Sequence, residues 1–201
     1  MKRDDLTLKD IVVQNELFVV YPYQTKDARF LAEWMSVSQL DLFYLSSSFT
    51  FPVSEDTFND YVAKASSEEG HRFYSVLLKK SNEHIGHFEI KNINMRHNIG
   101  TGAHIVLDPK YRKKGWGKPF VHLVSEAGFE ALNLDRLSLS VHTENLSAIA
   151  AYIRAGYRFE GTIRDVLTFE DKRFSLYQLS LLKTEWQEMR PLQFKNDKFI
   201  K

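Results

Sequence analysis

The sequence contains no cysteine among its 201 residues. Disulfide bonds, thiolate metal sites and a cysteine nucleophile are therefore excluded within this chain. The histidines do not supply an alternative metal site, because His71, His84, His97 and His122 show no metal-ligand spacing with acidic residues. We predict that the protein holds no metal ion.

The chain also lacks a surplus of charge of either sign and lacks long hydrophobic runs. Lys and Arg number 27 against 26 Asp and Glu, which predicts no broad nucleic-acid or membrane surface. Apolar runs such as FYSVLL are far shorter than the about 20 residues of a membrane-spanning helix. The first residues, MKRDDLTLKD, are too acidic and polar for a signal peptide, so we expect a cytoplasmic protein.

Internal repeats and long Gly/Ser or Pro linkers are absent as well. Apolar residues make up 43% of the chain, which is typical of a soluble globular protein with a full core. We predict one domain over residues 1–190, followed by a polar, loosely held tail over residues 191–201.

Hydrophobic periodicity predicts an α+β fold. Thr25 and Ser54 are good caps for two early helices, and two further helices follow the loop at residues 108–117 and Asn145. Gly156 suits the left-handed position that ends the last of these. The expected strands cover residues 17–21, 73–78, 84–93, 103–107, 136–141, 157–163 and 174–182. This order predicts a mixed sheet with helices on both sides.

The stretch DPKYRKKGWG, residues 108–117, lies between an apolar strand and a helix. Gly115 and Gly117 allow the backbone to approach a ligand closely, and the first amides of a helix lack internal partners. With the positive end of the helix dipole they form a site for phosphate or pyrophosphate. The alternative is a solvated basic turn that happens to precede a helix.

The spacing excludes two other phosphate-binding motifs. A P-loop needs Lys followed by Ser or Thr directly after its second glycine, whereas Gly117 is followed by Lys118 and Pro119. A dinucleotide fingerprint needs a third glycine where this chain has Phe120.

Arg112-x-x-Gly115-x-Gly117 resembles the R/Q-x-x-G-x-G/A acyl-CoA motif of the GNAT superfamily of N-acyltransferases. The sequence around this motif resembles the branch of the ribosomal-protein alanine N-acetyltransferases. The segments that carry the resemblance are LDPKYRKKGWGKPFVHLVSEAGFEALNLDRLSLSV, then NLSAIAAYIRAGYRFEG and a hairpin ending in LLKTEW. The resemblance covers residues 84–186, about half of the chain. It implies a GNAT fold and acetyl-CoA as the acetyl donor.

The resemblance also implies where acetyl-CoA binds. The strands that end near Leu107 and Val141 splay apart, and the thioester lies between them. The backbone of one strand pairs with the pantetheine arm, and amides of the glycine-containing loop hold the pyrophosphate. The implied CoA-binding residues are Ile105, Val106, Leu107, Arg112, Lys113, Lys114, Gly115, Trp116, Gly117, Lys118 and Asn145.

Amide formation from an amine and a thioester needs a base, an oxyanion donor and a proton for the leaving thiolate. Because there is no cysteine, we expect direct attack in a ternary complex. A backbone N–H between Ile105 and Leu107 is the expected oxyanion donor. Tyr152 matches the tyrosine of the family pattern N-x-x-A-x-x-x-Y and is the candidate acid. The alternative is that Tyr152 is a core aromatic of its helix.

The base is not fixed by the resemblance. Many relatives carry Glu two residues before Gly in the strand that leads to the loop, but this chain has Gly102 and His104 there. We name His104 and Glu89 as catalytic candidates, since histidine titrates near neutral pH. His142 with Glu144, or a chain of water molecules, are further alternatives.

We expect the acceptor site between the early helices and the closing hairpin, with Phe43, Tyr44, Phe49, Phe51 and the FEDKRF turn as candidates. The predicted activity is acetyl transfer to a primary amine, either a small molecule or a protein N-terminus. A CoA-binding sensor that has lost catalysis, and a nucleotide-phosphate binder, are the alternatives. A homodimer is compatible with the sequence.

Overall fold

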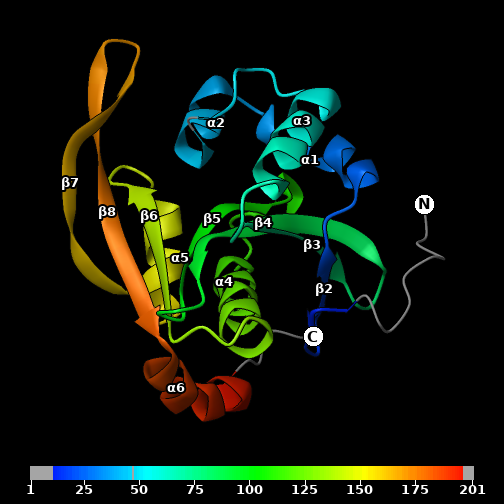
Figure 1. Ribbon diagram of the computed structural model, residues 1–201, viewed down its shortest axis with the longest axis vertical. Coiled ribbons are helices and arrows are strands. Elements are labelled where there is room, and N and C mark those ends of the chain that lie inside the picture. The colour runs from blue at the N-terminus through cyan, green and yellow to red at the C-terminus, as the bar shows by residue number, and fades with distance from the viewer. Residues whose placement is uncertain (1–10, 47, 197–201) are drawn as a thin grey trace.

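The computed structural model describes residues 11–46 and 48–196. Its core is an eight-stranded sheet in the order β1-β2-β3-β4-β5-β6-β8-β7 (Figure 1). All neighbours pair antiparallel except β5 and β6, which run parallel. The strands are β1 (Val13–Gln14), β2 (Phe18–Pro22), β3 (Arg72–Leu78), β4 (Glu83–Asn94), β5 (Ile99–Leu107), β6 (Arg136–His142), β7 (Arg158–Phe169) and β8 (Lys172–Leu182).

Helices cover both faces of this sheet. Figure 1 shows α1, α2 and α3 together on one side of the sheet, with α4 on the other. The helices are the short 3-10 turn η2 (Thr25–Asp27), α1 (Ala28–Met35), α2 (Gln39–Leu45), α3 (Glu55–Ser66), the 3-10 turn η3 (Pro109–Tyr111), α4 (Gly117–Glu126), its π-helical extension η4 (Ala127–Ala131), α5 (Leu146–Arg154) and α6 (Lys183–Asn196). None of the helices in the described ranges is long and apolar enough to cross a membrane.

Two hydrophobic cores lie on opposite faces of the sheet. The larger packs Phe88 and Ile90 of β4 against Phe120 and Val124 of α4. The smaller lies beneath α1–α3. Because successive strand residues point to opposite faces, His87 and Glu89 face the smaller core, where His87 meets Phe58 of α3 edge-on at 5.4 Å.

Local sequence signals fix the ends of several helices. The side chain of Ser54 accepts a hydrogen bond from the Thr57 amide and caps α3, and Asn145 does the same for α5 through the Ala148 amide. Gly156 follows α5 with φ of 96°, the left-handed conformation in which glycine avoids the usual Cβ strain. These caps confirm the predicted starts of both helices and the predicted end of α5.

The parallel pair β5–β6 opens into a gap. The two strands pair only through three residue positions, Ile99–Thr101 against Arg136–Ser138, although β5 continues to Leu107 and β6 to His142. Beyond these pairs the strands diverge, as predicted, and each presents an unpaired main-chain edge to the gap.

The predicted fold class is confirmed, and the structure differs from the sequence prediction in local ways. The sequence prediction omitted β1, α2 and α6, and it started β5 four residues too late. Thr25, predicted to cap the first helix, is the first residue of η2, and α1 begins at Ala28. The predicted tail boundary at residue 190 falls inside α6, which continues to Asn196. Residues 197–201 of that tail lie outside the described part of the chain.

Candidate active site

A fully buried carboxylate, Glu89 of β4, lies at the centre of a polar cluster. His104 Nδ1 lies 2.8 Å from Glu89 Oε1, and His71 Nε2 lies 2.8 Å from Oε2. The Tyr61 hydroxyl of α3 donates to Oε2 at 2.8 Å, and His87 Nε2 lies 3.4 Å from Oε1. Four side chains from four segments therefore converge on one carboxylate.

These contacts keep Glu89 ionised. Burial alone would raise the pKa of Glu89, but attraction to His104 and hydrogen bonds from His104, His71 and His87 outweigh it. The pKa of Glu89 is therefore held well below its usual range. Burial lowers the pKa of His87, and the hydrogen bond and attraction to Glu89 offset only part of that effect. Burial raises the pKa of Tyr61, and Glu89 raises it further.

A β-bulge turns His104 toward Glu89. Three residues of β4, His87 to Glu89, lie opposite four residues of β5, Ala103 to Val106, so β5 carries one extra residue. His104 sits within this irregularity with φ of 41°, a conformation that few side chains adopt. Its Nδ1 faces Glu89, and the residue also lines a pocket, so Nε2 is the ring nitrogen left for a ligand.

That inner pocket has a volume of about 190 Å³ and lies where β5 and β6 separate. Thr101 to His104 of β5 form one wall, and Ser140 and His142 of β6 form another. The remaining walls come from α2 with the residues after it, from Lys91 of β4, and from Leu167 and Leu176 of the β7–β8 hairpin. The pocket therefore adjoins the gap, α2 and the β7–β8 hairpin.

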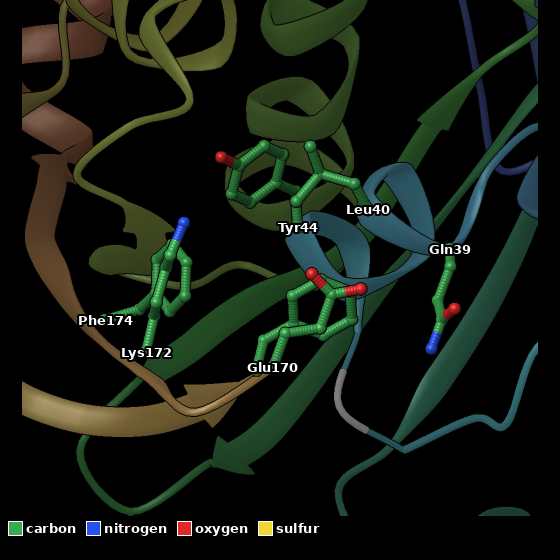
Figure 2. A pocket seen from close by; sticks show the side chains of 7 residues that line it. Gln39, Leu40, Tyr44, Glu170, Lys172 and Phe174 are labelled. Carbon is green, nitrogen blue, oxygen red and sulfur yellow. The ribbon is translucent and has the colours of Figure 1, made fainter.

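An outer pocket of about 400 Å³ lies next to the inner one, and Tyr44 lines both. Figure 2 shows it bounded by residues of α2, including Tyr44 and Leu40, and by Glu170, Lys172 and Phe174 of the hairpin tip. Nearby, the ring of Phe43 stacks on Phe169 at 4.6 Å.

The other two aromatic residues predicted for the acceptor site, Phe49 and Phe51, lie in different surroundings. Phe49 packs 5.6 Å from the His104 ring, whereas Phe51 is an exposed residue that lines neither pocket.

The glycine-containing loop joins β5 to α4 and has an unusual backbone. Lys113 and Gly115 adopt φ of 58° and 85°. Asp108 bonds through its amide to Ile85 of β4, so the amide and carbonyl of Leu107 face the opposite way, toward the gap. Arg112 Nε donates to that carbonyl at 2.9 Å and ties the loop to the strand end.

The loop continues directly into α4. Gly117 is its first residue, and a Cβ there would lie 3.2 Å from the Cβ of Ala151 in α5. Lys113 and Lys114 are exposed, while Trp116 and Lys118 are partly covered. The predicted phosphate-binding residues thus form the loop directly before α4 and its first two residues, Gly117 and Lys118.

Tyr152 lies on α5 and is buried. Burial raises the pKa of Tyr152 to about 12, so its phenol stays protonated near neutral pH. Its ring is 6.0 Å from that of Tyr157 in the larger core. Asn145, at the other end of α5, uses its side-chain oxygen as the helix cap.

Two alternative bases are placed less favourably. His142 lines the inner pocket, but burial lowers its pKa, and its ring packs 4.6 Å from Phe43. Glu144 is exposed and contacts Thr143, and it lines neither pocket. Sequence reasoning missed His71 and Tyr61, although a His-x-Glu pair in an otherwise apolar strand at residues 87–89 was a signal that buried polar partners must exist.

Within the described ranges, no group of His, Asp and Glu side chains is arranged to hold a metal ion. The contacts that form the cluster around Glu89 are hydrogen bonds among protein side chains. It joins the smaller core to the inner pocket.

A family model described as an acetyltransferase (GNAT) domain matches residues 18–158 of this chain. The chain belongs to the GNAT acetyltransferase family. The match extends from β2 to the start of β7 and so includes the gap, the glycine-containing loop, the Glu89 cluster and α5.

Individual relatives are distant. An uncharacterized N-acetyltransferase p20 of Bacillus licheniformis is 30% identical over 117 residues, 56% of this chain and 63% of that protein. A spermidine N(1)-acetyltransferase of Escherichia coli K12 is 32% identical over 87 residues, 43% of this chain and 46% of that protein. The alignments thus span less than two thirds of the length of these curated relatives.

Among solved structures, a spermidine N-acetyltransferase from Vibrio cholerae in complex with CoA and spermine superposes with a TM-score of 0.74 at 19% identity. The superposition covers 86% of this chain and 99% of that one. At this identity it confirms the GNAT fold. The relatives found do not single out the ribosomal-protein alanine branch that the sequence resembles.

Two features of this GNAT chain fit a coenzyme A ligand. The gap offers the main-chain edges of β5 and β6 to an extended pantetheine arm. The loop offers helix-start amides, left-handed backbone at Lys113 and Gly115, and several cations to a diphosphate.

Proposed function

We propose that this GNAT protein transfers an acetyl group from acetyl-CoA to a primary amine by direct attack in a ternary complex. The observation that carries the proposal is the position of the inner pocket. It lies at the β5–β6 gap and is lined by a histidine whose other ring nitrogen is held by an ionised carboxylate.

Two features of the chain support a coenzyme site, the loop before α4 and the free edge of β5. The loop from Arg112 to Lys118 would bind the diphosphate through amides and side-chain cations. The free edge of β5 at residues 105–107 would pair with the pantetheine arm. Acetyl-CoA, when bound, supplies an acetyl thioester activated toward amines.

The base in this proposal is His104. A protonated amine is not nucleophilic, so a proton must leave it before attack. His104 Nε2 would accept that proton, while Glu89 fixes the ring orientation through Nδ1 and stabilises the imidazolium that forms. Glu89 acts as a positioning residue here, because it is fully buried.

The remaining roles belong to main chain and to Tyr152. The Leu107 amide faces the gap and would donate a hydrogen bond to the developing oxyanion. Tyr152 would protonate the departing thiolate, and the raised pKa keeps its proton available at neutral pH.

The acceptor could be a small amine or a protein N-terminus. The names of two relatives point to polyamines for those proteins. The prediction from the sequence is a primary amine of either kind, a protein N-terminus or a small molecule. Both acceptor classes therefore belong in the first assay.

The test is amine-dependent release of free CoA from acetyl-CoA, followed with a thiol reagent. Because the protein has no cysteine, it contributes no thiol background. Sustained release with at least one amine, together with acetyl-amine product by mass spectrometry, is the expected result. CoA binding without turnover on any amine would favour the alternative of a CoA-binding sensor. Binding of ATP but not CoA would overturn the cofactor assignment.

A further inference from the structure

The inner pocket has an unusual charge for a site that accepts amines. Its described lining residues include no aspartate or glutamate. Glu89 does not line it, and both oxygens of that carboxylate are already engaged by the histidines and Tyr61. His142 lines the pocket in its neutral form, because burial lowers its pKa. Lys91 is the permanent cation of the described lining.

Lys91 is placed to reach a ligand held at His104. It follows Glu89 by two residues on β4, so both side chains emerge on the same face of the sheet. Its register partner on β5 is Thr101, three residues before His104, and both of these also line the pocket. Among the described residues Lys91 forms no ion pair or side-chain hydrogen bond, and it is half-buried.

This charge pattern discriminates between amines. A polyamine would bring ammonium groups beside Lys91 in the inner pocket, whose described lining has no carboxylate; Glu170 lines only the outer pocket, together with Lys172. An amine that carries its own carboxylate would place that group against Lys91 in a charge-assisted hydrogen bond. The inner pocket alone, at about 190 Å³, is also smaller than the roughly 300–1,000 Å³ of pockets for drug-sized ligands, so an acceptor that fits within it is small.

We propose that the acceptor is a small primary amine bearing a carboxylate near the amine, of the amino-acid type, and that Lys91 is the residue that selects it. This inference rests on the proposed acetyltransferase function and names its substrate class. It differs from the substrates that the names of the polyamine-acetylating relatives indicate for those proteins.

The experiment compares four acceptors: alanine, alaninamide, spermidine and a short peptide with N-terminal alanine. Each is measured with the wild-type protein, Lys91→Gln, Lys91→Glu and the matched control Lys80→Gln. Lys80 is an exposed lysine in the turn between β3 and β4 and lines neither pocket. For each acceptor, kcat/KM of a variant is divided by that of wild type, so that differences in intrinsic amine reactivity cancel.

Lys91→Gln is expected to lower kcat/KM for alanine about tenfold or more, mainly through KM, and to leave alaninamide nearly unchanged. Lys91→Glu is expected to lower kcat/KM for alanine further and to raise kcat/KM for spermidine above the wild-type value. Lys80→Gln is expected to leave kcat/KM unchanged for all four acceptors. Thermal unfolding of all variants shows whether each remains folded.

Two kinds of failure are distinguishable. Wild-type preference for spermidine or the peptide, with the same acceptor ranking in Lys91→Gln, would overturn the inference while leaving the acetyltransferase intact. Absence of turnover with every amine would overturn the proposed function. In that case calorimetric binding of alanine and alaninamide in the presence of CoA decides the inference, and equal alanine affinity for wild type and Lys91→Gln would refute it.

Discussion

His104 combines a rare backbone conformation with a position at the pocket wall. A left-handed φ costs a non-glycine residue of the order of 1–3 kcal/mol, and such strain tends to occur where function requires it. Here the bulge directs Nδ1 to Glu89 on the neighbouring strand. The strained backbone thus orients the side chain of a candidate base.

Replacing His104 with asparagine tests this role. Asparagine tolerates left-handed backbone and can still donate to Glu89, so we expect little change in melting temperature. We expect kcat to fall about 100-fold, because the side chain no longer accepts a proton near neutral pH. Unchanged kcat across the pH range would remove His104 from the mechanism.

Tyr152 is the second residue whose role can be tested alone. With a pKa of about 12, its phenol remains protonated across the usual assay range, so it should cause no alkaline loss of kcat until pH approaches that value. Tyr152→Phe is expected to lower kcat at every pH with the shape of the profile unchanged. A variant as fast as wild type would show that Tyr152 is a core aromatic only.

At the level of elements, the turn between β7 and β8 has a left-handed backbone that Asn and Gly adopt more readily than its native residues. Glu170 and Asp171 form a two-residue hairpin loop, and both adopt positive φ, of 46° and 62°. Asn-Gly is the favoured pair for such a turn. We expect the double change Glu170→Asn, Asp171→Gly to raise the free energy of unfolding by about 0.5–1 kcal/mol, measured by urea denaturation. A lower value would mean that the native side chains stabilise the turn.

The loop before α4 provides a test of the coenzyme site. Gly115→Val forces a branched side chain into φ of 85° and should distort the amides that would hold the diphosphate. We expect CoA affinity to fall about tenfold or more by calorimetry. Gly161→Val is the control, because a Cβ at Gly161 of β7 meets no atom within 4 Å. Equal affinity in both variants would refute the loop assignment.

Sequence reasoning succeeded best where signals are local. Caps at Ser54 and Asn145 and the glycine at 156 are read from a few neighbouring residues, and all three are in place. Helix α2 was missed although Ser38 and Asp41 carry the same kind of cap signal, with the Ser38 side chain accepting from the Asp41 amide.

The Glu89 cluster could not be assembled from sequence because its members meet through tertiary packing. His71, Tyr61 and His104 are 18, 28 and 15 residues from Glu89 along the chain. The contact to His104 also depends on a one-residue bulge, and no spacing rule gives the register of two strands across a bulge. Glu89 and His104 were predicted as alternative bases, whereas the structure joins them as a pair.

At the scale of the whole molecule, Glu89 couples stability to pH. Its folded pKa lies well below the ordinary value of 4.5, so its contribution is fully present above that pH and is lost as pH falls toward the folded pKa. We expect the difference in unfolding free energy between wild type and Glu89→Gln to be largest above pH 4.5 and to shrink below it. A difference that grows on acidification would contradict this sign.

The open seam between β5 and β6 has a consequence for how proteins of this architecture diversify. Its borders are peptide groups, which side-chain substitutions other than proline leave in place, whereas the neighbouring walls are side chains on α2, β4 and the β7–β8 hairpin. Substitution of those side chains can therefore change which acceptor binds while the coenzyme site stays the same. The main chain then provides the coenzyme site, and side chains around the pocket determine which acceptor binds.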